Sequence, residues 1–137
     1  MRQMMRTLLL LIVLSVNSPG YGQQNDRIST IDFVQVLNEN KAEAVYYYQH
    51  NWKVLRNMAL ENDYIHSFQI LETPFTEEQP FELMLITTYA NKKQYDLRED
   101  HFRTLIQEIG ELKLLNEKKP AEFRKTLFSK ENVRHWD

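Results

Sequence analysis

The stretch FELMLITTY, residues 81–89, decides the fold because it reads as a strand that is buried on both faces. Large apolar residues occupy both alternating sets of positions: Phe81, Leu83, Leu85 and Tyr89 on one, and Met84 and Ile86 on the other. Strands that are apolar on both parities lie inside a sheet rather than at its edge. We therefore expect this strand to be central.

Two further strands are predicted on the N-terminal side of this segment. Residues 30–37 read TIDFVQVL and residues 65–71 read IHSFQIL, and both are short and rich in β-branched or aromatic residues. Between the second of these and the central strand lies TPFTEEQP, whose two prolines forbid a continuous helix or strand. This segment is expected to be a loop.

Two amphipathic helices complete the pattern. The first follows an NEN turn at residues 38–40 and extends to about Asn62, and its core stripe recurs every three or four residues as Val45, Tyr48, Trp52, Leu55 and Ala59. The second covers residues 97–112, with Phe102, Leu105, Ile106 and Ile109 as its apolar face. Tyr47 lies beside the first stripe and is expected to meet either the C-terminal tail or a partner subunit.

The C-terminal segment allows two interpretations. Pro120 either opens a short helix or breaks the chain, and FRKTLF at residues 123–128 alternates well enough for a last strand. We favour a strand here, which makes the order βαββαβ in an α+β domain.

The N-terminus has the features of a secretory signal peptide. Arg2 and Arg6 precede an apolar stretch at residues 7–16, and Pro19, Gly20 and Gly22 follow it. The stretch is about half the length of a membrane-spanning helix. We predict a signal peptide over 1–22, a flexible lead-in over 23–29 and a single domain over 30–137. The mature protein would be secreted or periplasmic, without stable membrane insertion.

Composition excludes several classes of function. The 137 residues carry 17 basic and 19 acidic side chains, a net charge of -2, which disfavours a nucleic-acid partner. The chain has no cysteine, so disulfide and thiolate chemistry are absent. No metal-binding spacing such as HExxH, no Gly-rich phosphate loop and no nucleophile elbow occurs. We therefore expect no metal and no cofactor.

The chain resembles a secreted member of the dimeric α/β barrel superfamily. The resemblance lies in the order of the predicted elements and in the residue patterns of TIDFVQVL, YYYQHNWKVL, IHSFQIL and FELMLITTY. This resemblance implies a ferredoxin-like fold with an antiparallel sheet, two helices on one face, and a homodimer formed through the open face. The superfamily includes small monooxygenases and haem-degrading enzymes. The haem-degrading members use an Asn, a Trp and a His, and this sequence offers no matching set.

Two functions follow from this interpretation. The first is an exported domain that binds a small apolar ligand or a protein partner as a homodimer, with a pocket between sheet and helices lined by Phe33, Trp52, Phe68, Leu85 and Tyr89. The alternative is a cofactor-independent monooxygenase or isomerase, which needs an apolar pocket and a base. His66 and His101 are the candidate bases.

Overall fold

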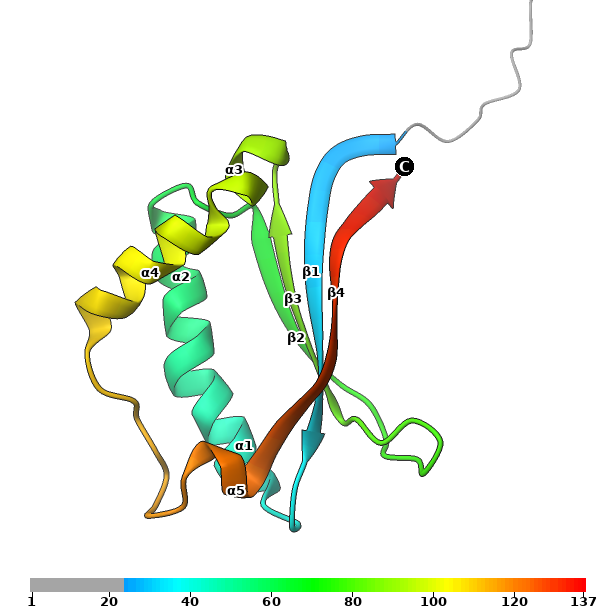
Figure 1. Cartoon of the computed structure of the whole chain (residues 1–137), viewed down its shortest axis with the longest axis vertical. Coiled ribbons are helices and arrows are strands. Elements are labelled where there is room, and N and C mark those ends of the chain that lie inside the picture. The colour runs from blue at the N-terminus through cyan, green and yellow to red at the C-terminus, as the bar shows by residue number, and fades with distance from the viewer. Residues whose placement is uncertain (1–23) are drawn as a thin grey trace, which may run out of the picture.

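The computed structural model describes residues 24–137, so the predicted signal peptide lies outside the described residues. The elements follow one another as β1 Gln24–Val36, α1 Lys41–Tyr47, η1 Tyr48–Trp52, α2 Lys53–Glu61, β2 Ser67–Glu72, β3 Leu83–Tyr89, α3 Lys92–Asp96, α4 Arg98–Ile109, α5 Pro120–Phe123 and β4 Arg124–Trp136. Figure 1 shows the helices on one side of the sheet and the opposite side bare. None of the helices within these residues is long and apolar enough to cross a membrane.

The sheet has the strand order β2-β3-β1-β4, and every neighbouring pair is antiparallel. Each helical crossover therefore joins two strands that are separated by a third. This is the ferredoxin-like βαββαβ arrangement, and the predicted fold class is confirmed. β3 lies between β2 and β1, as its apolar faces predict.

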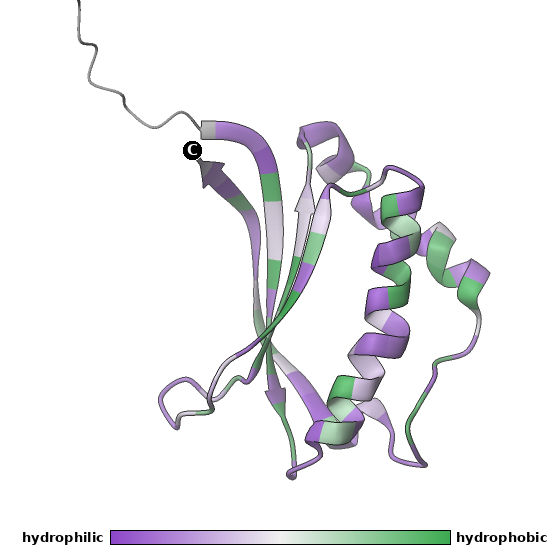
Figure 2. Cartoon of the chain, turned by 180° about the vertical axis from the view of Figure 1, so that it is seen from behind, coloured by the Kyte–Doolittle hydropathy of each residue, from purple (hydrophilic) through white to green (hydrophobic). Residues whose placement is uncertain are grey.

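The strands at the two ends of the domain are longer than the sequence pattern predicts. β1 begins at Gln24, so the flexible lead-in over 23–29 was wrong for the residues that the structure describes. The polar residues of this segment are ordered because they pair with the end of β4, where Gln24 lies opposite Trp136 and Ile28 opposite Arg134. Figure 2 shows that the C-terminal end of β4 is hydrophilic, so an apolar residue pattern does not predict this part of the strand.

The C-terminal segment contains both the short helix and the strand that were predicted as alternatives. Pro120 opens the four-residue helix α5, and β4 follows it directly. A further short helix, α3, was not predicted. Its start is fixed by Asn91, whose side-chain oxygen accepts a hydrogen bond from the amide of Gln94 at 3.0 Å.

The first helix is continuous in space but contains a π-helical turn, η1. Its predicted stripe does face the sheet: Tyr48, Trp52 and Ala59 are buried, and they pack in two clusters. One cluster joins Tyr48 and Trp52 to the inner face of β1 and β3, and the other joins Ala59 to Tyr89 and to α4. In the second helix Leu105 is buried, but Ile106 is 53% exposed and is not a core residue.

The outer face of the sheet carries an aromatic cluster. Phe33 stacks on Phe128 with ring centroids 4.5 Å apart and meets Phe81 edge-on at 4.9 Å. Ile31 lies opposite Ile86 on the same face. Phe33 was predicted to line a pocket between sheet and helices, and that placement was wrong because its neighbours Asp32 and Val34 occupy the inner face.

Candidate functional site

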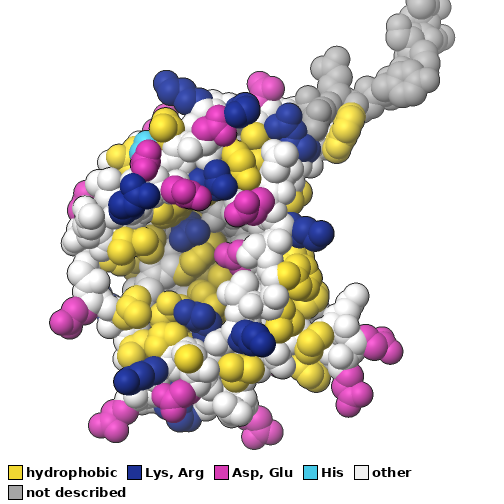
Figure 3. Space-filling view, in the orientation of Figure 1, with side chains coloured by type: hydrophobic (Ala, Val, Ile, Leu, Met, Phe, Trp, Pro, Cys, Tyr) yellow, Lys and Arg dark blue, Asp and Glu magenta, His cyan; other side chains and the backbone are white. Residues whose placement is uncertain are grey.

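A cleft separates the inner face of β1 and β4 from the helices. Figure 3 shows this face hollowed between α4 with its following linker on one side and β4 on the other, with hydrophobic and basic side chains in and around the hollow. Its volume is about 320 Å³. The lining residues are Asp32, Tyr47, Tyr48, Asn51, Trp52, Leu55, Leu85, Ile106, Ile109, Gly110, Leu112, Arg124 and Thr126.

The strand wall of the cleft is partly polar. Asp32 lies between Leu85 of β3 and Ser129 of β4 in the sheet. The hydroxyl of Ser129 donates to Asp32 Oδ1 at 2.5 Å. Because strand side chains alternate between faces, Asp32 and Val34 both point toward the helices. This face of TIDFVQVL therefore presents a carboxylate to the cleft, beside Leu85 of β3 and Thr126 of β4.

Arg124 and Tyr47 form one end of the cleft. The Arg124 Nη2 donates to the Tyr47 hydroxyl at 3.3 Å, and its guanidinium lies 5.1 Å from the centroid of the Tyr47 ring. Phe123 packs beside the same ring at 5.6 Å. Of the two contacts that the sequence left open for Tyr47, the C-terminal tail is the one observed.

Arg56 lies against the cleft on the helix side. Its guanidinium is sandwiched between the Trp52 and Phe102 rings, 4.2 Å and 4.3 Å from their centroids. Its Nε donates to Thr87 Oγ1 at 3.2 Å. Burial in these surroundings lowers the pKa of Arg56 to about 10. The cation is therefore fixed in place by aromatic rings and one hydroxyl.

The same region contains hydrogen-bond donors that lack acceptors. Within residues 24–137, Trp52 Nε1 and Arg124 Nε are buried without a partner. The pKa of Tyr48 is raised, mainly because burial disfavours its charged form. The Tyr48 hydroxyl therefore stays protonated further into the alkaline range than an exposed tyrosine does.

The linker between α4 and α5, residues 110–119, forms a strap that lines the helix side of the cleft through Gly110 and Leu112. Gly110 ends α4 with φ 70°, a backbone conformation that glycine adopts without a Cβ clash. Asn51 then holds the strap by two hydrogen bonds to Lys113, each 2.8 Å long. Leu112 lines the cleft and is 53% exposed, as is Ile106.

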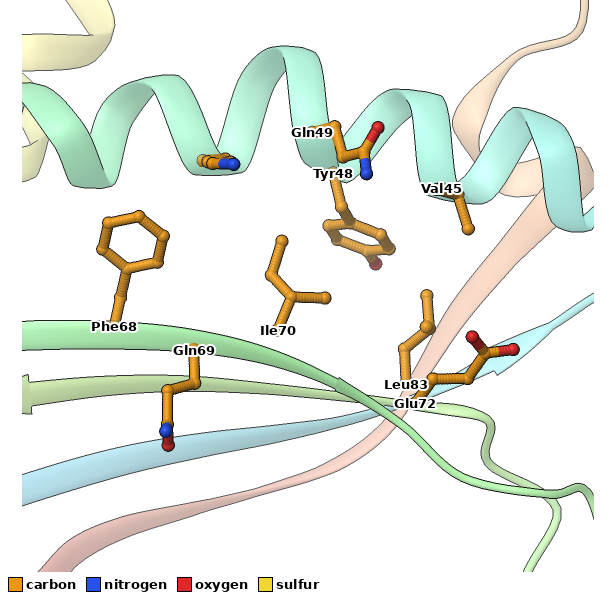
Figure 4. Close-up of a pocket in the computed structure, with 9 residues that line it drawn as sticks. Val45, Tyr48, Gln49, Phe68, Gln69, Ile70, Glu72 and Leu83 are labelled. Atoms are coloured by element: carbon orange, nitrogen blue, oxygen red, sulfur yellow. The ribbon is translucent and has the colours of Figure 1, made fainter.

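A second pocket, of about 370 Å³, opens on the other side of the first helix, beside β2. Figure 4 shows Phe68, Ile70 and Leu83 pointing from the sheet toward the helix, whereas Gln69 points away. Its rim is formed by flexible polar side chains such as Gln49 and Lys53. Its one lining carboxylate, Glu72, is exposed and already paired with Lys41, whereas Asp32 and Arg124 in the β1/β4 cleft form no salt bridge within residues 24–137, so this cleft is the stronger candidate site.

The structure divides the predicted ligand-binding residues. Trp52 and Leu85 line the cleft, and Phe68 lines the second pocket, where it also meets Trp52 edge-on at 5.7 Å. Tyr89 is buried in the cluster with Leu105, where burial raises its pKa. Phe33 is on the opposite face of the sheet.

The two predicted bases are not in the cleft. His66 is exposed next to the start of β2. His101 stacks on Tyr64 with centroids 3.7 Å apart and lines a separate depression near Asn91. Among residues 24–137 no group of three or more His, Asp or Glu side chains is placed to hold a metal ion.

Sequence reasoning missed Asp32, Arg56 and Arg124. Asp32 shares its parity with Val34 and Val36 in TIDFVQVL, and a lone carboxylate among inward apolar residues is a usable signal. Arg56 follows Trp52 by four residues and so lies on the same helix face as the core stripe. Arg124 left no such signal, because its position depends on where β4 begins.

The chain was also compared with known proteins. No protein-family model matches it, and no curated protein matches it. The solved structure of a protein from Nitrosomonas europaea, described as an antibiotic biosynthesis monooxygenase, is similar with a TM-score of 0.36 and 16% identity, over 84% of this chain and 93% of that chain. The ferredoxin-like fold of this chain rests on its own strand order and helix placement.

Proposed function

We propose that this protein binds a small, largely apolar molecule in the cleft between β1/β4 and the helices. The observation that carries the proposal is the pair Ile106 and Leu112, two large apolar side chains at the cleft that are each 53% exposed. Exposed apolar surface that lines a concavity is typical of ligand sites. Leu55 and Leu85 continue the apolar lining inside.

A ligand in this cleft would remove that apolar surface from water. Each square ångström of apolar surface so buried contributes about 25 cal/mol. The volume of about 320 Å³ suits a molecule of two or three fused or linked rings. The few polar groups in the wall would fix its orientation.

Binding of the neutral fluorophore phenylnaphthylamine tests the proposal. Leu112→Asp places a charge in the apolar wall and should weaken binding by about tenfold or more. Leu115→Asp is the matched control, because Leu115 lies on the same strap, is 48% exposed and does not line the cleft. Equal affinity of the two variants, or no binding by the wild type, would reject this site.

Export and dimerisation are part of the same proposal. The charged and apolar segments of residues 1–22 support export, and the outer-face cluster of Phe33, Phe81 and Phe128 supports a homodimer. A native mass spectrum of the protein from the exported fraction tests both. It should show a chain beginning at Gln23 and an assembly of two copies. A full-length chain would reject signal cleavage, and a monomer would reject the dimer.

A second function is favoured by Asp32. A cofactor-independent monooxygenase or isomerase needs a base inside an apolar pocket, and Asp32 is the carboxylate that the cleft contains. The Ser129 hydroxyl bound to Oδ1 would orient the carboxylate. In this role Asp32 replaces His66 and His101, and it would take a proton from an acidic C–H or O–H of the bound molecule.

Oxygen uptake with anthrone, whose central CH₂ is acidic enough for a carboxylate to deprotonate, tests the monooxygenase. Asp32→Asn should abolish uptake above the uncatalysed rate, while Asp26→Asn, at an exposed position of β1, should leave it unchanged. Exchange of the same CH₂ protons with deuterated water tests the proton transfer alone. If the wild type accelerates neither process, the monooxygenase or isomerase function is rejected, and the proposal of ligand binding without catalysis is unaffected.

A further inference from the structure

Two arginines beside the cleft differ from the other partly buried arginine of the described residues. Arg98 stacks on Tyr95 at 4.0 Å and also forms a salt bridge with Glu131. Arg56 and Arg124 stack on aromatic rings in the same way, but neither forms a salt bridge with any residue from 24 to 137. Neither guanidinium therefore has a carboxylate of the described residues within salt-bridge distance, although the charge of Asp32 acts on Arg56 from farther away.

Arg56 is the more constrained of the two. Ring contacts on both sides and the bond to Thr87 fix the guanidinium in one orientation. Only its Nε is used by that bond, so the two terminal nitrogens keep their donors for another group. A partly buried cation without a counter-charge is destabilising to the folded chain, and such groups are retained most often at functional sites.

The position of Arg56 connects it to the cleft. Thr87, its partner, lies two residues along β3 from Leu85, so both side chains point inward and their Cα atoms are separated by about 7 Å. Trp52, whose ring carries the guanidinium, lines the cleft directly. Figure 3 shows basic atoms within the hollow itself as well as at its margin. Arg56 is not itself a lining residue, but its guanidinium packs directly on Trp52, which is one.

The local electrostatics favour a negative ligand. Asp32 is the single carboxylate in the lining; its Oδ1 accepts a hydrogen bond from Ser129, and within residues 24–137 it forms no salt bridge with Arg56 or Arg124. The enclosed donors Trp52 Nε1 and Arg124 Nε are shielded from direct contact, but they add positive potential. In a cleft with low-dielectric walls, these charges attract an anion more strongly than they would in water.

We propose that the ligand of this cleft is an aromatic or alicyclic anion, with a carboxylate or sulfonate group bound by Arg56 and an apolar body against Leu85, Ile106 and Leu112. The planar fork of a guanidinium matches the two oxygens of such a group. This inference rests on the proposed function, because it names the chemistry of the molecule that the cleft binds.

Two fluorophores that differ by one charged group test it. Anilinonaphthalene sulfonate and phenylnaphthylamine share the same ring system, and only the first carries a sulfonate. The wild-type protein should bind the sulfonate about tenfold more tightly or better, and the difference should shrink as salt is added. This comparison needs no variant, so it does not depend on the folding of one.

Arg56→Gln then assigns the effect to one residue. It should remove most of the preference for the sulfonate, measured as the ratio of the two dissociation constants in the same variant. Arg98→Gln is the matched control, because Arg98 is also stacked on an aromatic ring but lies away from the cleft, and it should preserve the preference. 2-Naphthoate should displace the sulfonate probe, and the neutral 2-naphthamide should do so about tenfold less well.

The outcomes separate the two proposals. Equal binding of both fluorophores, each sensitive to Leu112→Asp, would reject the anionic ligand and keep the cleft as an apolar site. A sulfonate preference that survives in Arg56→Gln would reject Arg56 as the anion-binding group. Absence of binding by either fluorophore would reject the proposed ligand-binding function itself.

Discussion

Asn51 and Lys113 are joined by two hydrogen bonds that fasten the strap to the first helix. The Asn51 Nδ2 donates to the carbonyl of Lys113 at 2.8 Å, and the amide of Lys113 donates to Asn51 Oδ1 at 2.8 Å. Asn51 is buried, and it lies in the π-helical turn η1. π-Turns re-aim side chains within a helix and are frequent at functional sites. Here the turn directs an amide at the chain that walls the cleft.

Asn51→Ala should lower the free energy of unfolding by about 1–3 kcal/mol, because two backbone groups of Lys113 lose their partner. Urea unfolding measures this loss. Amide exchange at Lys113 should accelerate at the same time. Asn57→Ala, at an exposed position of α2, should change stability by less than about 0.5 kcal/mol. Unchanged exchange at Lys113 would mean that other contacts hold the strap.

Trp52→Ala should cost about 3–5 kcal/mol because it removes a large buried ring from the main core cluster. The same ring meets Phe68 edge-on and supports the guanidinium of Arg56. Urea unfolding checks the value. A loss below 1 kcal/mol would contradict the packing of this helix against the sheet.

The core could be predicted from sequence because it depends on local periodicity. Tyr48, Trp52 and Ala59 recur at helical spacing, and each is buried. Ile106 satisfies the same spacing on α4 but lines the cleft and is 53% exposed. Periodicity assigns a face to a residue, and it cannot tell whether that face meets other side chains or an open concavity.

The site could be predicted only in part, because it depends on contacts between distant segments. Trp52 and Leu85 were found as apolar inward residues, and they do line the cleft. Arg124 reaches Tyr47 only because β4 pairs with β1 in a specific register. His66 and His101 were predicted as bases, but His66 precedes β2 and His101 of α4 lines a separate depression, so neither lies in the cleft.

Arg56→Met should raise the free energy of unfolding by about 1–2 kcal/mol in the absence of ligand, because an apolar side chain replaces a partly buried charge without a carboxylate partner. A thioether also packs well between the Trp52 and Phe102 rings. Arg98→Met breaks the salt bridge with Glu131 and should give no such gain. Urea unfolding compares both with the wild type. Clear destabilisation by Arg56→Met would show that the cation holds the fold together.

Tyr48→Phe should reduce the loss of stability at alkaline pH. Burial raises the pKa of Tyr48 above the ordinary value of 10.0, so the folded state keeps a proton that the unfolded state releases. Stability from this residue is therefore complete below about pH 10 and falls as the pH rises further. At pH 7 the variant should lie within about 1 kcal/mol of the wild type. Parallel stability curves for both proteins up to pH 11 would contradict this.

Phe128→Glu should convert the proposed homodimer into a monomer. Phe128 stacks on Phe33 at the centre of the outer-face cluster, and it is 46% exposed in a single chain. A symmetric interface brings the same patch of both copies together, so one substitution places two carboxylates in an apolar contact. Leu60→Glu is the matched control, since Leu60 is 39% exposed but belongs to α2 in the helix layer. Sedimentation measures the masses of all three proteins. Retention of the dimer by Phe128→Glu would reject the outer-face interface, and loss of the dimer in Leu60→Glu would instead place the interface on the helix side.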